Sequence, residues 1–322
     1  MMKHYDVVAL GELLIDFTEN GTSVQGNPVF EANPGGAPCN VLAMLRKLDK
    51  QCAFVGKVGD DMFGHQLKAV AEGAGIDMSA LRMDKNVRTT LAFVKTDESG
   101  DRDFSFYRNP GADMMLTEDE LPMDMLRDTR IFHFGTLSMT HEDVRQATKA
   151  AVLAAKEAGA IISFDPNLRP PLWDSHNEAK AQMLWGLEQA DVVKIADNEI
   201  EFLTGTADYE KGAAILRERF PNLRLLNVTA GANGSYTFYE DRKAFVPSFL
   251  LGGTIETTGA GDTFCASVLN FVLERGLDGL TRDELRQMLR FANAAAYLVT
   301  TRKGAIKSMP ERALVEAILN KH

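Results

Sequence analysis

The middle of the chain alternates short apolar runs with longer stretches of helical periodicity, and this alternation restricts the fold more than any other feature. The predicted elements follow in the order strand 131–135, helix 141–158, strand 160–165, helix 177–189, strand 191–196, helices 199–203 and 211–220, and strand 223–229. Strands that are separated by crossover helices form parallel sheets. The chain is therefore predicted to be an α/β protein with a mostly parallel sheet flanked by helices on both faces. Ligands are expected at the carboxyl ends of its strands.

The N-terminal third contains strands that do not follow this alternation. Residues 5–17 are predicted to form one buried strand, and residues 18–34, rich in Asn, Gly, Thr and Pro, irregular strands or loops. Residues 89–95 and 103–108 alternate apolar and polar side chains around a turn at 97–102, which predicts a β-hairpin. A hairpin inserted into an α/β chain is expected to extend out of the main sheet. No low-complexity linker divides the chain, so one domain over residues 1–322 is predicted.

The composition favours a small-molecule partner. The 322 residues are 45% hydrophobic and 25% charged, as in ordinary globular proteins. The net charge of -10 disfavours binding to nucleic acid or to an anionic membrane. No signal peptide or transmembrane stretch is recognisable. Cys39, Cys52 and Cys265 lack the spacing of a zinc site or a disulfide framework, which fits a cytoplasmic protein.

Residues 257–264 read Thr-Thr-Gly-Ala-Gly-Asp-Thr-Phe and lead into an apolar stretch of helical length. If a helix starts near Gly261, the N–H groups of Gly259, Ala260 and Gly261 point outward and form an anion hole. Asp262 has the wrong charge for holding phosphate and the right chemistry for taking a proton from an attacking hydroxyl. The segment therefore predicts phosphoryl transfer. The alternative is a glycine turn entering a helix, with Asp262 complementing the helix dipole.

A second pair of glycines, Gly35 and Gly36, precedes another predicted helix, and Asn40 follows on its first turn. Adjacent glycines allow a close approach of backbone to ligand, and the Asn amide offers both a donor and an acceptor to a polyol. Asp16 is a carboxylate in an otherwise apolar run, so it is expected either to bond to backbone or to accept hydrogen bonds from sugar hydroxyls. Cys39 is expected to be a packed residue rather than a nucleophile.

Two arginines are candidates for substrate binding. Arg169 lies in a loop, 164–173, that contains three prolines, and Arg108 is the last residue of the predicted hairpin. A stiff loop that presents Asp, Asn and Arg suits the recognition of an anion or a polyol. His133, inside an apolar strand, is expected to be a packed core histidine.

The segments 257–264 and 35–40 resemble the two signatures of carbohydrate kinases related to ribokinase and fructokinase, and further motifs follow in the same order over nearly the whole chain. The resemblance implies that Asp16, Gly35, Gly36 and Asn40 bind the sugar. It also implies that Asn198 and Glu201 organise Mg2+ through its water shell, and that ATP lies along a turn containing Thr229, Gly231 and Gly234, with Asn293 facing the adenine. Residues 18–34 and 89–108 would form a β lid, which in such kinases often serves as a dimer interface.

One position departs from the resembled signature. The family usually has Asp where this chain has Glu256, and that residue helps to hold a monovalent cation; Glu256 and Thr258 are therefore candidate K+ ligands. Neither a P-loop nor a dinucleotide-binding fingerprint occurs. The sequence is most similar to fructokinases, which implies phosphorylation of fructose to fructose 6-phosphate with ATP and Mg2+.

Two alternatives stay open at this point. Because Arg108 and Arg169 together would suit a sugar-acid carboxylate, 2-keto-3-deoxygluconate kinase is the second candidate. A sugar-binding regulator without catalysis is the third. The presence of Asp262, Gly259, Gly261 and Glu201 argues against a regulator, because binding alone needs no base.

Overall fold

A nine-stranded sheet forms the centre of the protein in the computed structural model, which describes residues 3–96 and 102–322. The strand order is β13-β12-β11-β10-β9-β8-β1-β4-β5. The pairs from β5 to β11 are parallel, and β12 and β13 are antiparallel at one edge. The strands are β1 Tyr5–Leu10, β4 Cys52–Gly59, β5 Leu81–Asp84, β8 Thr129–Gly135, β9 Ile161–Asp165, β10 Val192–Ala196, β11 Leu225–Thr229, β12 Ser235–Tyr239 and β13 Arg242–Val246. The predicted mostly parallel sheet is confirmed.

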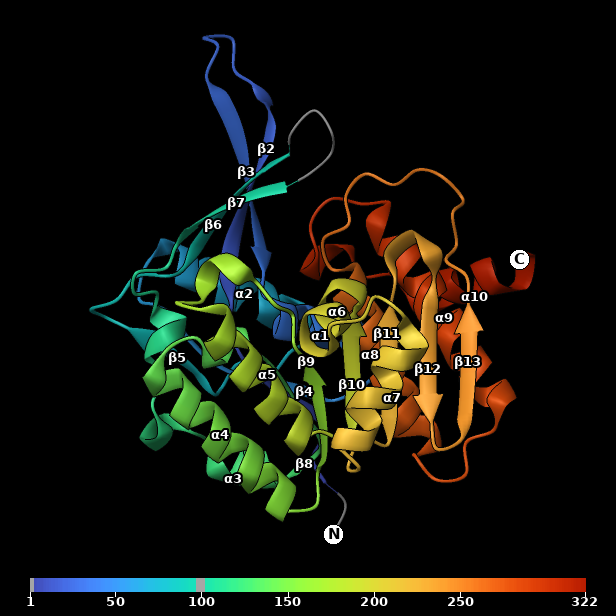
Figure 1. Ribbon diagram of the computed structural model, residues 1–322. Helices are drawn as coiled ribbons and strands as arrows, with labels where there is room; N and C mark the ends of the chain where they lie inside the picture. The colour runs from blue at the N-terminus through green and yellow to red at the C-terminus, as the bar shows by residue number, and fades with distance from the viewer. Residues whose placement is uncertain (1–2, 97–101) are drawn as a thin grey trace.

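Helices cover both faces of this sheet, and each face has its own apolar core (Figure 1). One core includes residues of α1 Ala37–Lys47, α2 Met62–Gly73, α8 Ala260–Arg275, α9 Arg282–Thr300 and α10 Arg312–Lys321. The other includes residues of α3 Met123–Arg127, α4 Glu142–Glu157, α5 His176–Gln189, α6 Asp197–Thr204 and α7 Tyr209–Arg219. Within the described residues, no helix combines the length and the apolar character that a membrane crossing requires.

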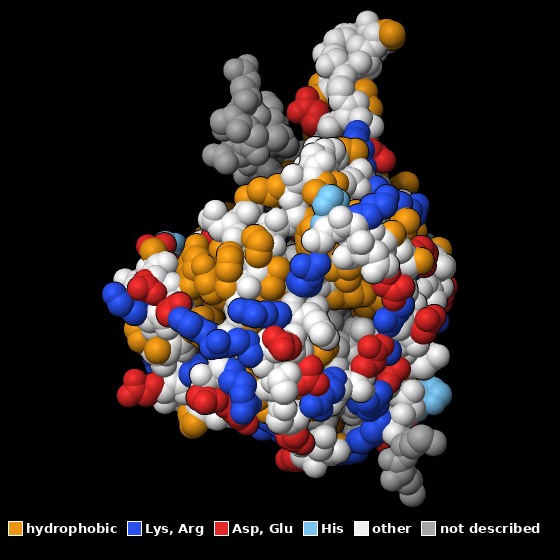
Figure 2. Space-filling view, turned by 90° about the vertical axis from the view of Figure 1, so that its right-hand side faces the viewer, with side chains coloured by type: hydrophobic (Ala, Val, Ile, Leu, Met, Phe, Trp, Pro, Cys, Tyr) orange, Lys and Arg blue, Asp and Glu red, His pale blue; other side chains and the backbone are white. Residues whose placement is uncertain are grey.

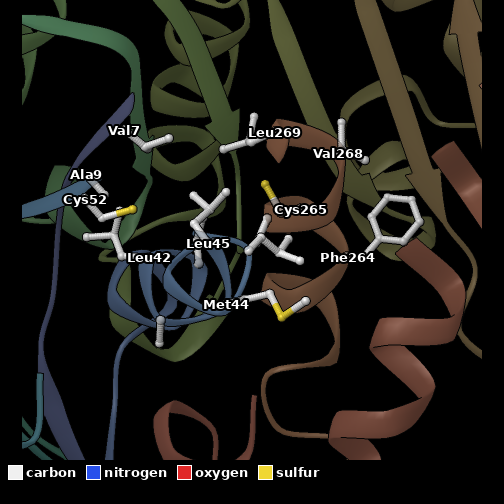
Figure 3. Packing of buried hydrophobic residues seen from close by; sticks show 14 of the residues in the cluster. Val7, Ala9, Leu42, Met44, Leu45, Cys52, Phe264, Cys265, Val268 and Leu269 are labelled. Carbon is white, nitrogen blue, oxygen red and sulfur yellow. The ribbon is translucent and has the colours of Figure 1, made fainter. Parts of the chain in front are cut away.

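The helices α1 and α8 lie side by side although more than half of the chain separates them. Figure 3 shows Leu45 of α1 opposite Cys265 and Leu269 of α8, and all three side chains are buried. An apolar stripe on each helix makes this packing favourable, because each buried side chain is removed from water. The contact also brings the first turns of the two helices together, which determines the geometry of the site described below.

A second, four-stranded sheet stands apart from the main one, in the order β3-β2-β6-β7. Its strands are β2 Leu14–Thr22, β3 Pro28–Gly35, β6 Leu91–Thr96 and β7 Arg102–Tyr107. The predicted hairpin is confirmed, since β6 and β7 pair antiparallel, whereas most of its predicted turn, residues 97–101, lies outside the described residues. The ring of Phe93 stacks on Phe17 at 4.8 Å and meets the edge of Phe30 at 5.5 Å. Figures 1 and 2 show β2 and β3 rising clear of the main body.

The prediction of one strand over residues 5–17 is wrong. The chain leaves the main sheet after Leu10 and enters the small sheet at Leu14, so that the run forms β1 and β2. Glu12 lies in the break, where its buried carboxylate accepts a hydrogen bond from the Ala37 N–H at 2.7 Å. An apolar run does not reveal that its two halves pair with different partners, because both halves are buried.

His133 and Cys39 are packed core residues, as predicted. The His133 ring is buried, its Nδ1 lies 2.9 Å from the Ser163 hydroxyl oxygen, and burial lowers its pKa to about 3. Burial raises the pKa of the Cys39 thiol to about 12, which keeps the sulfur protonated and unreactive.

Candidate active site

The helix α8 begins at the glycine turn that the sequence singled out. Gly259 has a left-handed φ of 78° and caps the helix, which starts at Ala260. The Ala260 N–H donates to the Thr257 carbonyl at 3.3 Å. The first N–H groups of a helix have no acceptor within the helix, and the positive end of its dipole lies there. Asp262 is on this first turn and is buried.

Asn40, on the first turn of α1, lies directly opposite Asp262. Its Nδ2 donates to Asp262 Oδ2 at 2.8 Å, and its Oδ1 is buried without a hydrogen-bond partner among the described residues. The turn before α1 requires Gly36, because a Cβ there would lie 2.3 Å from the Glu12 carbonyl oxygen and φ is 134°. The sequence predicted both residues but not this contact between them.

Burial raises the pKa of Asp262 to about 6, with a further contribution from the nearby Asp165 carboxylate. The Asn40 hydrogen bond, the Lys194 ammonium and the Arg169 guanidinium act in the opposite direction. A carboxylate with a pKa near 6 is ionised at neutral pH and is a stronger base than an exposed Asp. These surroundings suit the removal of a proton from a hydroxyl.

A polar cavity of about 260 Å³ opens beside Asp262. Most of the residues predicted to bind sugar, phosphate or a cation line it: Asp16, Gly36, Asn40, Arg169, Asn198, Glu256, Thr258, Gly259, Gly261 and Asp262. Gly35 does not, but a Cβ at this position would lie 2.8 Å from Asp16 Oδ2, so the missing side chain leaves room for that carboxylate.

The expectation that Arg108 faces this cavity is wrong. Its guanidinium is buried and pairs with Asp113 at 2.7 Å, and it donates to the Thr140 hydroxyl at 2.7 Å and the Leu137 carbonyl at 2.9 Å. A guanidinium whose donors are bonded to protein groups on several sides is a structural link and has little capacity for a ligand. The sequence could not show this, because Asp113 and Thr140 reach Arg108 only in the folded chain.

A second cavity of about 330 Å³ lies on the other side of the α8 start. Its lining includes the predicted nucleotide-binding residues Thr229, Gly231, Gly234 and Asn293, together with apolar side chains such as Phe249, Leu250 and Ala296. The Asn293 amide is bonded within the protein, to the Ser235 hydroxyl and the Val246 and Pro247 carbonyls, so it holds the cavity wall in place.

The two cavities meet at the 257–262 segment, since Thr257 and Gly261 line both of them. A kinase needs a polar cavity for the substrate that carries the hydroxyl and a less polar cavity large enough for a nucleobase. It also needs a carboxylate between them, here on a helix N-terminus. The site has all three.

Comparison with known proteins agrees with this geometry. A family model described as pfkB family carbohydrate kinase matches residues 5–312. The chain belongs to this family. The sequence is similar to Fructokinase-2 of Oryza sativa subsp. japonica, with 43% identity over 318 residues that cover 98% of this chain and 94% of that protein.

Two solved structures resemble this pfkB kinase closely. The fructokinase of Xylella fastidiosa with bound ATP has a TM-score of 0.89 and 30% identity, covering 98% of this chain and 99% of that one. The fructokinase of Vibrio cholerae O395 with fructose, ADP and calcium ion has a TM-score of 0.88 and 31% identity, with the same coverage of both chains. The predictions of the family, of the ribokinase-like fold and of a carbohydrate kinase are confirmed.

Two of the three acidic residues of α6, Glu199 and Glu201, lie in different environments. Glu201, the predicted magnesium residue, is exposed and does not line either cavity, whereas Glu199 is buried and lines the polar cavity. Glu199 accepts hydrogen bonds from the Leu168 and Ala196 N–H groups, both at 2.7 Å. Glu199 therefore anchors the loop that carries Arg169, while the role of Glu201 stays a prediction.

Sequence reasoning missed three charged residues that line the polar cavity: Glu12, Lys194 and Glu199. All three are buried, and Lys194 pairs with Asp165 at 3.2 Å. Burial raises the pKa of Glu12 to about 7. A signal for Lys194 was present, since it is a charged residue inside the otherwise apolar strand β10, and such a residue is rarely buried unless it is paired.

Proposed function

We propose that this pfkB kinase transfers the terminal phosphoryl group of ATP to fructose and forms fructose 6-phosphate. The observation that carries the proposal is the position of Asp262, which is buried at the start of α8 where the polar and the apolar cavity meet. The names of the relatives support the substrate: the Oryza sativa protein is called a fructokinase, and the Vibrio cholerae structure contains fructose and ADP.

The proposed path of the nucleotide follows the two cavities. The adenine lies in the apolar cavity next to the turn with Gly231 and Gly234, and the phosphates extend past Gly261 toward Asp262. There the N–H groups of Gly259, Ala260 and Gly261 act as the anion hole, aided by the helix dipole. The bond Ala260 makes to Thr257 is long, at 3.3 Å, and is readily exchanged for a phosphate oxygen.

In the proposed reaction Asp262 removes the proton from the sugar hydroxyl as its oxygen attacks the terminal phosphorus. The bond from this phosphorus to the bridging oxygen of ADP breaks, and ADP leaves with the electron pair. Asn40 keeps its hydrogen bond to Asp262 and orients the carboxylate, while its free Oδ1 accepts a hydrogen bond from another sugar hydroxyl.

Among the described residues, no three His, Cys, Asp or Glu side chains are grouped to hold an ion. A divalent cation such as Mg2+ would then take most of its ligands from phosphate oxygens and water, with Asn198 and Glu201 of α6 contacting its water shell. When bound, Mg2+ would neutralise part of the negative charge of the phosphates.

Fructose is favoured over a sugar acid because the polar cavity offers one guanidinium rather than two. Arg108 is bonded within the protein, so Arg169 is the arginine that lines the cavity among the described residues. Asp16, Asn40 and Asp262 present oxygens that accept hydrogen bonds from hydroxyls and repel a carboxylate. The net charge of -10 adds no long-range attraction for an acid.

We also propose a K+ site at Glu256 and Thr258, which both line the polar cavity. One carboxylate oxygen of Glu256 accepts a hydrogen bond from the Gly304 N–H at 2.9 Å, which fixes the side chain between two loops. The other oxygen remains for a cation, which would lie close to the anion hole.

The small sheet is proposed to act as a lid over the sugar and as an interface between two copies of the chain. Val24, Phe30 and Tyr107 are large exposed hydrophobic residues in or beside its strands, and the projection that carries β2 and β3 is visible in Figure 2. Burying such side chains against a second copy would be favourable.

A panel of sugars and sugar acids tests the proposed function. The purified protein is mixed with ATP, Mg2+ and one candidate acceptor, ADP release is followed, and the phosphorylated carbon of each product is assigned by NMR. Fructose is expected to be turned over and to carry the phosphate on its C6 oxygen. ADP release that no sugar stimulates would contradict the proposal.

A further inference from the structure

A buried lysine lies under the first turn of α8. Lys194 is on β10, and its Nζ lies 3.2 Å and 3.3 Å from the two carboxylate oxygens of Asp165. A Cβ placed on Gly261 would lie 3.2 Å from the same nitrogen, so the ammonium group faces the residue that precedes the base. Lys194 also lines the polar cavity. A charge in this position is within reach of any group that occupies the anion hole.

The surroundings keep this lysine charged without using all of its donors. Asp165, Glu199 and Asp262 raise the pKa of Lys194 in spite of its burial. Within the described residues Asp165 is its hydrogen-bond acceptor, and the oxygens of Glu199 accept from backbone N–H groups instead. An ammonium group has three N–H donors. At least one of them therefore remains for a ligand in the cavity.

The nucleotide has to pass this point. Gly261 lines both cavities, so phosphates that extend from the apolar cavity to Asp262 cross the α-carbon of Gly261. The absence of a side chain at this position leaves the space between ammonium and phosphate open. A cation in a water-poor site interacts with a phosphoryl group more strongly than an exposed one.

We propose that Lys194 is a further catalytic residue, whose ammonium group binds the terminal phosphoryl group while it moves from ADP to the sugar oxygen. Lys194 keeps its proton throughout; the proton of the hydroxyl goes to Asp262, and the electron pair of the broken P–O bond goes to ADP. This inference rests on the proposed kinase function and adds a residue to it.

The chain offers a matched control in Lys57. This lysine is also buried on a strand of the main sheet, β4, and its Nζ pairs with Glu120 at 2.7 Å and donates to the Met115 carbonyl at 2.8 Å. It does not line either of the two cavities. Replacing Lys57 by Met therefore removes a buried ion pair without removing a group near the phosphate path.

The first experiment compares kcat and nucleotide affinity in Lys194→Met, Lys194→Arg and Lys57→Met. Lys194→Met is expected to lower kcat by about 10²- to 10³-fold, as the loss of one charge-stabilising donor does. Its affinity for ATP should fall more than its affinity for ADP, because ADP lacks the terminal phosphoryl group. Lys194→Arg should recover part of the rate, and Lys57→Met should stay within about tenfold of wild type. A Lys194→Met variant within tenfold of wild type, or an equal loss in Lys57→Met, would overturn the proposal.

A double variant, Lys194→Met with Asp165→Asn, separates catalysis from folding. It removes both charges of the Lys194–Asp165 ion pair, so a pair with a purely structural role would be dispensable in it. The proposal expects a folded protein, by circular dichroism and thermal melting, that remains slow; recovery of kcat to within about tenfold of wild type would overturn it. The preference for ATP over ADP is measured without sugar. It therefore tests Lys194 even if fructose is not the substrate.

Discussion

The two cavities that meet at α8 are constructed in different ways. The polar cavity is lined by ionisable and amide side chains, among them Asp16, Asn40, Arg169 and Asp262, which come from widely separated parts of the chain. The apolar cavity is shaped by glycine turns and apolar side chains, and its one amide, Asn293, is bonded inside the wall. The difference suggests that substrate choice and chemistry depend on side chains on one side, whereas nucleotide binding depends on backbone shape on the other.

The sharpest test of this contrast removes the base at the junction. Asp262→Asn is expected to lower kcat by about 10²- to 10⁴-fold, because it removes the proton acceptor and keeps the shape. The KM values for sugar and ATP should change little. Steady-state kinetics measure all three quantities.

Asp283→Asn is the matched control, because Asp283 is an exposed acid in the first turn of α9 and complements only that helix dipole. It should be close to wild type. If Asp262→Asn kept more than a tenth of the wild-type turnover, Asp262 would not be the base and the helix-dipole alternative would stand.

A substitution at Gly234 tests whether nucleotide binding depends on the backbone shape of the apolar cavity. This residue has a φ of 112°, and a Cβ on it would lie 2.4 Å from the Val246 carbonyl oxygen, so Gly234→Ala must displace the loop after β13. Strain of about 1 to 3 kcal/mol should raise the KM for ATP by roughly tenfold or more, with the KM for fructose unchanged.

Gly159→Ala is the control for strain alone, since Gly159 has a φ of 78° with no atom near its absent Cβ and lies outside both cavities. It should lower the melting temperature and leave both KM values unchanged. An equal rise in both KM values in Gly234→Ala would mean that the two cavities are not separate in construction.

A smaller effect is expected in the pH dependence of the rate. The raised pKa of Asp262, about 6, predicts that kcat/KM increases with pH and levels off above pH 6, because only the ionised carboxylate accepts the proton. The Asn40 hydrogen bond lowers this pKa, so Asn40→Ala should move the acid limb to higher pH. A limb that stayed in place or moved to lower pH would contradict the assigned contact.

The smallest effect concerns the monovalent cation. Because the longer side chain of Glu256 is anchored to Gly304, we expect K+ to activate the enzyme only weakly relative to tetramethylammonium at matched ionic strength. Equal rates in the two salts would remove the K+ site from the account.

Local patterns in the sequence were sufficient for most of the fold. The strand and helix alternation from β8 to β11 was predicted with only small boundary shifts, because each element has an apolar period of its own. The break between β1 and β2 was missed for the opposite reason. Both strands are apolar at the junction, and the turn is fixed by Glu12 bonding to Ala37, a contact between distant residues.

The site was predictable in its motifs but not in its contacts. The glycines at 36 and 259 stand out in the sequence, and their positive φ values explain why. By contrast, Arg108 was assigned to the substrate although Asp113 and Thr140 bind its guanidinium. Lys194 was overlooked because its partners Asp165 and Glu199 are separate in sequence and meet only at the sheet edge.

The most direct test of the central claim is the ratio of kcat/KM values for fructose and 2-keto-3-deoxygluconate, measured with ATP and Mg2+ on the same preparation. The account predicts that fructose is preferred by about tenfold or more. A site built for a carboxylate would behave in the opposite way, because its buried guanidinium groups would stay unpaired when a neutral sugar binds. The account also predicts that Arg169→Ala leaves fructose the preferred substrate. A tenfold preference for the sugar acid, abolished by Arg169→Ala, would contradict the assignment to fructose. The protein would then be a kinase for sugar acids.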